Sequence, residues 1–306
     1  MEPLELSIYK RYRSLMDPTW KSGVDSACGG TAVAPCRSAR TVRLEDIVDD
    51  YDAFCFDGYG TLYNRGDFVY PGAREWFGLL RSRGKHVRLV TNAASNTEAA
   101  LAADAAARGF DFTAEETVSS GSLAAEFFAD AAARGCPVEE VFYIGRPTGV
   151  NLLHSFGVEA SENPGLPVVA VSSATADDEM YARAVSLLRK PDATLLVLNS
   201  DAWAPRIDGT RAPVSGALAE RLRLDSGCKD VRYFGKPFAG IFDKLKASLP
   251  AGSRILMIGD TLGTDVMGAC YANIDSALVI GRNEPAAELA EDELALGVVP
   301  DYYLDV

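Results

Sequence analysis

The chain has 306 residues, 48% of them hydrophobic, and a formal net charge of −13. This length suits about two domains, and the negative charge argues against nucleic acid or an anionic membrane as a partner, because both bind clustered Lys and Arg. No apolar run approaches the ~20 residues of a membrane span, and we see no secretory signal. Six cysteines without a C-x-x-C pair predict a reduced, cytoplasmic protein, and only two histidines argue against His-based catalysis or a His-rich zinc site.

The first elements in chain order are hard to assign. Residues 1–45 are atypical, and the segment Ser22 to Arg40 is rich in Ser, Gly, Ala and Cys without helical or strand periodicity. We expect an N-terminal extension that is irregular or lid-like.

The most informative stretch follows, at Ala53 to Thr61, which reads A-F-C-F-D-G-Y-G-T. A short apolar run bounded by turn residues is typical of a buried central strand. Asp57 ends this run, and a Gly-rich turn (Gly58, Gly60) then leads to Thr61. A carboxylate at the C-terminal end of such a strand lies where α/β sheets bind their ligands.

Strands and helices then alternate to the end of the chain. Ala73, Trp76, Phe77 and Leu80 have helical spacing, and Gly84 closes that helix. Further strands are predicted at Val87 to Val90, Val141 to Ile144, Val168 to Val171, Leu195 to Leu198, Val231 to Phe234, Ile255 to Ile258 and Ala277 to Ile280. This alternation predicts an α/β fold with a mostly parallel sheet.

Polar groups follow the predicted strands at four places: Asp57, Thr91-Asn92, Lys236, and Asp260 with Asp265. In a parallel sheet all C-terminal strand ends lie at one edge, so these groups can converge. Two or three carboxylates with open coordination suit Mg²⁺, which keeps waters and accepts phosphate oxygens. A carboxylate can attack phosphorus to give an aspartyl phosphate, with Mg²⁺ and Lys236 offsetting the negative charge. Thr61, Thr91 and backbone N–H groups can donate to the phosphoryl oxygens.

Each of these signals alone has a structural explanation. An Asp after an apolar strand is most often the cap of the next helix, and G-K-P at residues 235–237 is commonly a turn. All four signals, in this order and each at a strand end, favour a single site over four coincidences.

The set resembles the haloacid dehalogenase superfamily of aspartyl-nucleophile hydrolases, from about Asp46 to the C-terminus. It is most similar to the subclass IIA branch of p-nitrophenylphosphatase-like, NagD-like and pyridoxal-phosphate phosphatase-like enzymes. Segments outside the motifs that are similar to this branch are V-S-S-G-S-L-A-A at Val118 to Ala125, L-N-S-D-A-W-A-P at Leu198 to Pro205 and P-V-S-G-A-L at Pro213 to Leu218.

The resemblance implies a Rossmann-like, doubly wound core formed by residues 46–134 and 230–306. An α/β cap of the C2 type, residues 135–229, is then inserted in this core and selects the substrate. It also implies roles for nine residues, with Asp57, Tyr59 and Lys236 at the catalytic positions. Asp57 is the nucleophile, Thr91 with Asn92, Gly58 and Thr61 contacts the phosphoryl group, and Lys236 bridges nucleophile and phosphate. Mg²⁺ is bound by Asp57, the backbone carbonyl of Tyr59 and Asp260, supported by Asp265.

Two positions depart from the family pattern. The phosphatases usually place a second Asp where Tyr59 stands, and that Asp protonates the leaving group and activates water. An unperturbed phenol titrates near ~10, and the loss of a general acid or base typically costs ~10²–10⁴ in rate. The branch also often has Asn where Ala93 stands.

Tyr59 leaves three readings open. The first is Mg²⁺-dependent hydrolysis of a phosphorylated small molecule, including one whose leaving group needs no acid. The second is dehalogenation of a 2-haloacid, because D-x-Y-G-T is similar to the true dehalogenases of the superfamily. Those enzymes work without metal and have a smaller cap inserted just after the first motif. The third is a catalytically weak protein that binds a phosphorylated ligand.

Four residues outside the motifs are weaker candidates. Asp201 and Arg206 are placed to reach the substrate, Trp203 to stack on a ring and Arg65 to bind an anion. For each of them, a packing role or a solvent-exposed charge without function is the alternative interpretation. The sequence identifies neither the substrate nor the oligomeric state. A homodimer is one option for the latter.

Overall fold

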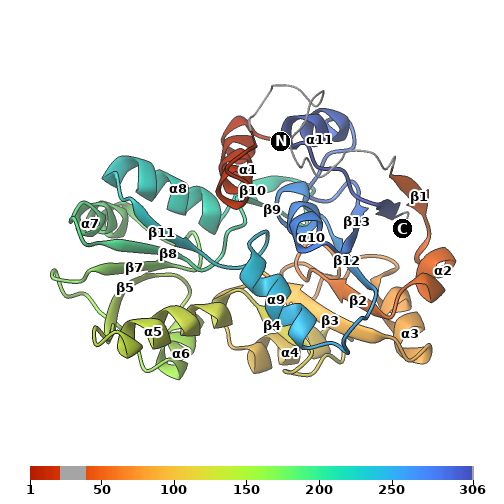
Figure 1. Cartoon of the computed structure of the whole chain (residues 1–306), viewed down its shortest axis with the longest axis horizontal. Coiled ribbons are helices and arrows are strands. Elements are labelled where there is room, and N and C mark those ends of the chain that lie inside the picture. Colours follow the sequence, from red (N-terminus) through yellow and green to blue (C-terminus); the bar gives the residue numbers. More distant parts are fainter. Residues whose placement is uncertain (21–38, 305–306) are drawn as a thin grey trace.

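The computed structural model describes residues 1–20 and 39–304. Two parallel sheets, each covered by helices on both faces, lie side by side (Figure 1). This arrangement confirms the predicted α/β fold with a mostly parallel core. No helix in these residues is long and apolar enough to cross a bilayer.

The first sheet has seven strands, all paired in parallel. Its order across the sheet is β1 (Arg40–Val42), β14 (Tyr302–Leu304), β13 (Asp275–Val279), β12 (Ile255–Gly259), β2 (Ala53–Phe56), β3 (His86–Thr91) and β4 (Thr117–Ser119). The strand that bears the A-F-C-F run, β2, is therefore central. All four of its residues are buried, as expected of a strand with helices on both faces.

Successive side chains of β2 point to opposite faces, and each face has its own helices. Phe54 and Phe56 pack in one cluster with Trp76 and Phe77. Those two residues belong to α3 (Ala73–Ser82), which confirms the helix predicted from their spacing. Cys55 packs on the other face with residues of α9 (Ala239–Ala247) and α10 (Met267–Ala272). The remaining core helices are α2 (Leu44–Ile47), α4 (Glu98–Ala107) and α11 (Leu289–Leu296).

The second sheet has five strands, also all parallel. Its order is β11 (Asp230–Tyr233), β8 (Thr194–Val197), β7 (Val168–Val171), β5 (Glu140–Ile144) and β6 (Glu159–Ala160). Residues of α7 (Asp178–Leu188) and α8 (Ser215–Ser226) pack on one face. Residues of α5 (Ala124–Ala133) and α6 (Thr148–Ser155) pack on the other. A short antiparallel pair, β9 (Trp203–Pro205) and β10 (Arg211–Pro213), follows β8.

The predicted division into core and cap stays a prediction, but two elements differ from it. We assigned residues 230–306 to the core, whereas β11 pairs with β8 in the second sheet. We also placed residues up to 134 in the core, whereas Ala124 and Phe128 of α5 pack with Val141 and Leu196 of the second sheet. Both elements adjoin the points where the chain passes between the sheets, and hydrophobic periodicity does not reveal which sheet an edge element joins.

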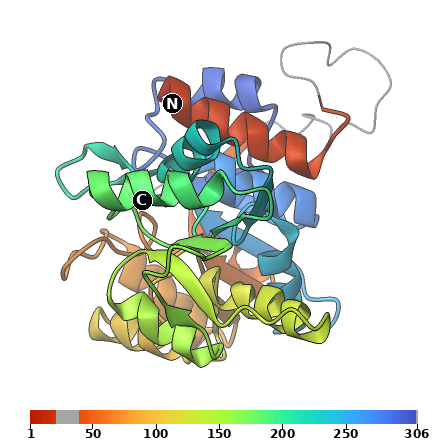
Figure 2. The ribbon, with the colours of Figure 1, turned by 90° about the vertical axis from the view of Figure 1, so that its left-hand side faces the viewer.

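The N-terminal region also differs from the expected irregular extension. Residues Pro3–Met16 form the helix α1, and β1 joins the edge of the core sheet. The buried face of α1 packs against residues that belong to the C-terminal half of the chain. Figure 2 shows the helix lying across the top of the molecule. The segment Ser22 to Arg40, which we expected to be loop or lid, lies almost entirely outside the described residues.

Candidate active site

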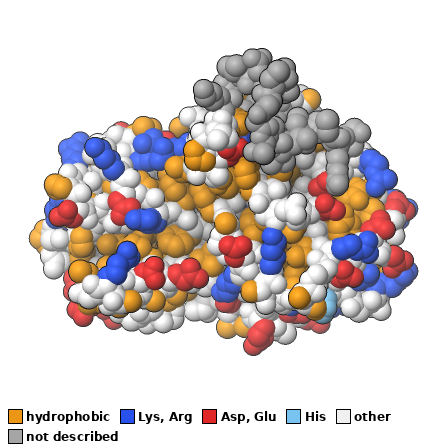
Figure 3. Space-filling model, viewed as in Figure 1, with side chains coloured by type: hydrophobic (Ala, Val, Ile, Leu, Met, Phe, Trp, Pro, Cys, Tyr) orange, Lys and Arg blue, Asp and Glu red, His pale blue; other side chains and the backbone are white. Residues whose placement is uncertain are grey.

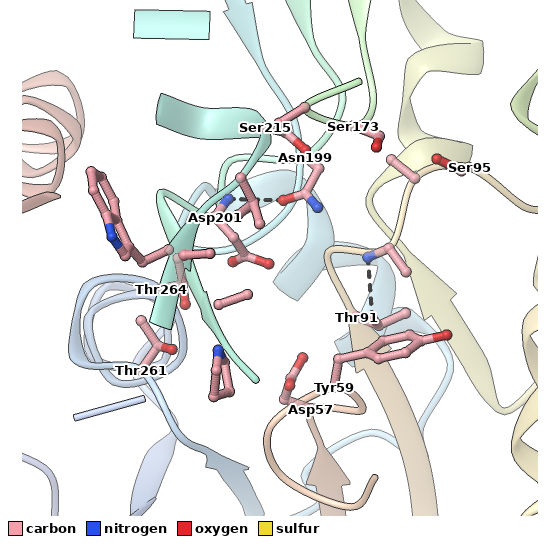
Figure 4. A pocket seen from close by; sticks show the side chains of 18 of the residues that line it. Asp57, Tyr59, Thr91, Ser95, Ser173, Asn199, Asp201, Ser215, Thr261 and Thr264 are labelled. Carbon is pink, nitrogen blue, oxygen red and sulfur yellow. Dashed lines mark hydrogen bonds between the residues drawn. The ribbon is translucent and has the colours of Figure 1, made fainter. Parts of the chain in front are cut away.

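A cavity of about 390 Å³ lies between the carboxyl ends of the two sheets. On the core side its lining includes residues that follow β2, β3 and β12, and on the other side residues that follow β5, β7, β8 and β11. Figure 4 shows Asp57, Thr91, Ser173 and Asp201 around this space. Since a parallel sheet presents all its C-terminal loops at one edge, the facing edges bring seven such loops to one site.

Lys236 holds two carboxylates together. Its Nζ atom lies 2.6 Å from Oδ1 of Asp57 and 2.8 Å from Oδ1 of Asp265, and it donates to the carbonyl of Val90 at 2.8 Å. The side chain is only 1% exposed. Burial acts to lower the pKa of Lys236, but Asp265, Asp57 and Asp201 outweigh it and raise the pKa. Lys236 is therefore a charged ammonium between two acids.

Asp260 lies on the other side of the Asp57 loop with one oxygen unsatisfied. Its Oδ2 atom is buried and has no hydrogen-bond partner within residues 1–20 and 39–304. The backbone of Gly60 has a φ of 105°, and a Cβ atom there would lie 1.9 Å from this oxygen. Only glycine lets the loop approach so closely.

Both carboxylates have a raised proton affinity. Burial, followed by the charges of Asp57 and Asp265, raises the pKa of Asp260 well above its ordinary range. Burial raises the pKa of Asp57 to about 7, although Lys236 acts to lower it. A cation between Asp57 and Asp260 would relieve this repulsion.

The acidic residues suit a divalent cation that is coordinated by only a few protein ligands. No cluster of three or more His, Cys, Asp or Glu side chains that could hold a metal occurs among the described residues. Mg²⁺ needs fewer protein ligands, because it keeps waters and takes substrate oxygens, and the unsatisfied Oδ2 of Asp260 fits such an ion. Asp265 instead contacts Lys236 and accepts a hydrogen bond from the Thr261 N–H at 3.2 Å, which makes any support of the metal indirect.

Tyr59 lines the cavity but turns its hydroxyl away from Asp57 (Figure 4). The hydroxyl donates to Oδ2 of Asp104 on α4 at 3.0 Å, and the ring packs edge-on against Tyr63. Burial and the charge of Asp104 raise the pKa of Tyr59 to about 12. Its predicted catalytic role does not fit this geometry, because the proton is committed to Asp104 and is harder to release.

Of the predicted phosphoryl-binding residues, only Thr91 lines the cavity. Its Oγ1 accepts a hydrogen bond from the Ala93 N–H at 3.1 Å and keeps its own proton for another acceptor. Thr61 and Gly58 are not part of the cavity wall, and the buried Oγ1 of Thr61 has no hydrogen-bond partner in the described part of the chain. Direct phosphoryl contact by Thr61 or Gly58 is therefore not supported.

Asn92 lies behind the wall as well, where it joins the two sheets. Its amide nitrogen donates to Oδ1 of Asp201 at 2.8 Å and to the Lys236 carbonyl at 3.0 Å. Its amide oxygen accepts from the Lys236 N–H at 2.8 Å. These bonds occupy the polar atoms of Asn92, so it positions Lys236 and Asp201, and our prediction that it binds phosphate does not fit.

Comparison with known proteins places this arrangement in a family. Residues 54–159 match the model of haloacid dehalogenase-like hydrolases and residues 233–305 match a second model of the same hydrolases, together more than half of the chain. The chain belongs to the haloacid dehalogenase-like hydrolases. This confirms the resemblance seen in the sequence.

Several relatives are named as phosphatases. The chain is 29% identical to chronophin from Bos taurus over 89% of its length and 96% of that protein. It is 25% identical to a 4-nitrophenylphosphatase from Schizosaccharomyces pombe, over 86% and 94% of the two chains. A possible sugar phosphatase of the family from Cytophaga hutchinsonii superposes with a TM-score of 0.75 at 26% identity, covering 88% of this chain and 98% of that one.

In this hydrolase, sequence reasoning missed much of the second wall of the cavity. Ser172 and Ser173 follow β7, and Arg146 follows β5. The signal that found Asp57 would have found them, because they too are polar residues within two positions of the end of a predicted strand. We did not apply it there, since nothing in the sequence says that the second sheet faces the first.

Proposed function

We propose that this hydrolase cleaves phosphorylated small molecules with Mg²⁺ through an aspartyl-phosphate intermediate. The observation that carries the proposal is the Asp57–Lys236 ion pair beside the unsatisfied oxygen of Asp260, all lining one cavity. The phosphatase names of the relatives support the same reaction class.

The chain's own residues suit each part of the reaction. A carboxylate oxygen of Asp57 attacks phosphorus, and the substrate oxygen leaves with the electrons of the broken P–O bond. Water then hydrolyses the aspartyl phosphate, which releases phosphate and restores Asp57. Lys236 holds Asp57 in place and offsets the charge on the phosphoryl group. Bound by Asp57, Asp260 and the carbonyl of Tyr59, Mg²⁺ would supply the remaining positive charge.

Carbon–halogen cleavage has less support. Attack on carbon needs no second acid beside Asp57, whereas Asp260 lies there with an unsatisfied oxygen and a raised pKa. Free halide released from a 2-haloacid without metal would favour this alternative. A role limited to binding a phosphorylated ligand predicts that no phosphate ester is turned over.

The test is hydrolysis of p-nitrophenyl phosphate and acetyl phosphate with Mg²⁺ or with EDTA. We expect turnover that requires Mg²⁺ and that falls by about 10³-fold or more in Asp57→Asn, since the variant lacks the attacking carboxylate. Asp67→Asn is the matched control, because Asp67 is an exposed residue of the same loop that does not line the cavity. Absence of turnover with Mg²⁺, or full activity of Asp57→Asn, contradicts the proposal.

A further inference from the structure

A phosphate ester with a poor leaving group needs a proton donor, and position 59 does not supply one here. The departing oxygen must receive a proton as the P–O bond breaks, and the hydroxyl of Tyr59 is bonded to Asp104 instead. The other acidic residues that line the cavity are Asp57, Asp260, Asp265 and Asp201.

Three of these four acids are already in use. Asp57 and Asp265 both contact Lys236, and Asp260 lies against Gly60 with its oxygen suited to a cation. Asp201 differs, because only its Oδ1 is engaged, accepting from Asn92, and its Oδ2 makes no hydrogen bond to the described residues. We propose that the carboxyl group of Asp201 donates the proton to the departing substrate oxygen.

The position of Asp201 suits an in-line displacement. In phosphoryl transfer the attacking and leaving oxygens lie roughly in line, on opposite sides of phosphorus. Asp57 enters the cavity from the core sheet, after β2, whereas Asp201 enters from the second sheet, after β8. Figure 4 shows the two carboxylates directed into the cavity from opposite sides, which places Asp201 on the leaving-group side.

The loop that carries Asp201 is fixed in place. The Asp201 N–H donates to Oδ1 of Asn199 at 2.8 Å, and the Asp201 carbonyl accepts from the Gly216 N–H at 2.7 Å. A Cβ atom on Gly216 would lie 2.5 Å from the Ser200 carbonyl, so this approach needs glycine. The next residue, Ala202, donates its N–H to the Tyr9 hydroxyl at 3.3 Å. A carboxyl held at both ends is pre-organised for proton transfer.

The electrostatic surroundings support the role. Burial, with a smaller contribution from the charge of Asp265, raises the pKa of Asp201 to about 6, against the opposing effects of Lys236 and the Asn92 hydrogen bond. The other titratable groups that interact with it are Asp57, Tyr9 and Tyr12. A pKa near working pH favours both halves of the cycle, because the acid must first give a proton and then take one back.

The proton balance closes over two steps. Protonated Asp201 gives its proton to the leaving oxygen as Asp57 bonds to phosphorus, and an alcohol departs. The Asp201 carboxylate then takes a proton from the water that attacks the aspartyl phosphate. Inorganic phosphate, Asp57 and protonated Asp201 remain, so no other reactant is needed.

The test compares leaving groups in Asp201→Asn, and it rests on the proposed phosphatase activity. The asparagine carbonyl can still accept the Asn92 hydrogen bond but cannot give up a proton. We expect kcat/KM for glycerol 3-phosphate, an alkyl ester, to fall by ~10²–10⁴. For p-nitrophenyl phosphate, whose leaving group needs no proton, kcat/KM is expected to fall less than about tenfold. This parameter reports the first step and is not affected by slower hydrolysis of the intermediate.

Matched variants separate chemistry from structure. Asp208→Asn changes an exposed aspartate in the turn between β9 and β10, outside the cavity wall, and is expected to behave as wild type with both esters. Asp201→Glu, which keeps the acid, is expected to recover part of the lost alkyl-ester activity. Thermal unfolding of each variant shows whether it folds.

The outcomes distinguish this inference from the proposed function. If the wild-type chain hydrolyses neither ester, the proposed function fails. If it hydrolyses both, an equal loss on both esters in folded Asp201→Asn, or no loss, overturns the role of Asp201 alone. Hydrolysis of p-nitrophenyl phosphate without any alkyl-ester turnover in the wild type overturns it as well.

Discussion

At the scale of single residues, the hydrogen bond between Tyr59 and Asp104 accounts for the orientation of the Tyr59 side chain. The hydroxyl of Tyr59 needs a partner because the side chain is partly buried, and Asp104 on α4 accepts its hydrogen bond at 3.0 Å. Asp104 in turn forms an ion pair with Arg108 at 2.6 Å. The side chain at position 59 therefore belongs to a structural network in the core, and the proton chemistry is left to the opposite wall of the cavity.

A second residue, Glu284, makes the stability of the fold depend on pH. It is fully buried, its Oε1 accepts from the Leu262 N–H at 2.9 Å, and its Oε2 has no hydrogen-bond partner in the described structure. Burial raises its pKa from 4.5 to about 8, against the Leu262 hydrogen bond. Between these values the folded chain keeps a proton that the unfolded chain releases, so the free energy of unfolding falls as pH rises.

Glu284→Gln should remove this fall in the free energy of unfolding with rising pH. The glutamine imitates the protonated acid, so we expect it to match wild type near pH 4.5 and to be more stable at pH 8, by on the order of 3 kcal/mol. Urea unfolding at several pH values measures the difference. Glu75→Gln, at an exposed position of α3, is the control that should change nothing. Parallel pH profiles for wild type and Glu284→Gln would contradict the assignment.

At the scale of elements, α1 joins parts of the molecule that the sequence does not connect. Tyr12 is 1% exposed and packs edge-on against Tyr233 and Phe238, with ring centroids 5.1 and 5.2 Å away. These two residues flank the return of the chain from the second sheet to the core. Glu5, also buried, forms an ion pair with Arg211 of β10 at 3.0 Å. The helix therefore braces the region around Lys236.

We expect Tyr12→Ala to reduce the free energy of unfolding by about 3–5 kcal/mol, the usual cost of removing a buried aromatic ring. Tyr12→Phe is the matched control, because the Tyr12 hydroxyl is buried without a hydrogen-bond partner among the described residues. Its removal should be neutral or slightly stabilising. The urea midpoint of each variant measures these effects, and an unchanged midpoint in Tyr12→Ala would show that the contact is not important.

The elements that could be predicted were those with strong local patterns. The apolar run of β2 and the helical spacing of Trp76, Phe77 and Leu80 depend only on neighbouring residues. Whether β11 joins the first or the second sheet depends on pairing with β8, more than thirty residues away along the chain, and local periodicity carries no such information. The prediction that Lys236 lies in the site still holds. Lys236 follows a strand of the second sheet, but the C-terminal ends of the two sheets face the same cavity.

The site shows the same limit. Asp57, Lys236 and Asp260 were found because they follow predicted strands together with Thr91, and four such signals in this order are unlikely to be coincidences. The engagement of Asn92 and the direction of the Tyr59 hydroxyl depend on partners that are distant in sequence, Lys236 and Asp104. Residue type and spacing do not reveal such partners.

At the scale of the whole molecule, net charge and local charge differ. The chain carries a net charge of −13, which repels anionic substrates, and the face in Figure 3 mixes acidic and basic side chains. Yet Arg65, Arg146 and Arg206 all line the cavity, are exposed, and form no ion pair with any other described residue. Three unpaired cations from three separate loops favour a substrate with a second negative group.

We therefore expect 3-phosphoglycerate to have a kcat/KM about fivefold higher than glycerol 3-phosphate, since exposed charge pairs contribute about 0.2–1 kcal/mol each. The preference should shrink with added salt and in Arg146→Gln. Arg134→Gln, at an exposed position outside the cavity wall, is the control. If the ratio of the two kcat/KM values changes neither with added salt nor in Arg146→Gln, the arginines do not select the substrate.

The position of α1 also bears on how this protein can be recombined with its relatives. A chimaera that takes the second sheet from another hydrolase would be cut at the two points where the chain passes between the sheets. Here the donor sheet would also have to accept Tyr12 beside Tyr233 and the Tyr9 hydroxyl beside Ala202. Residues 3–16 also pack against the core, so this helix must fit both the donor sheet and the host core, and the exchange involves two separate pieces of chain.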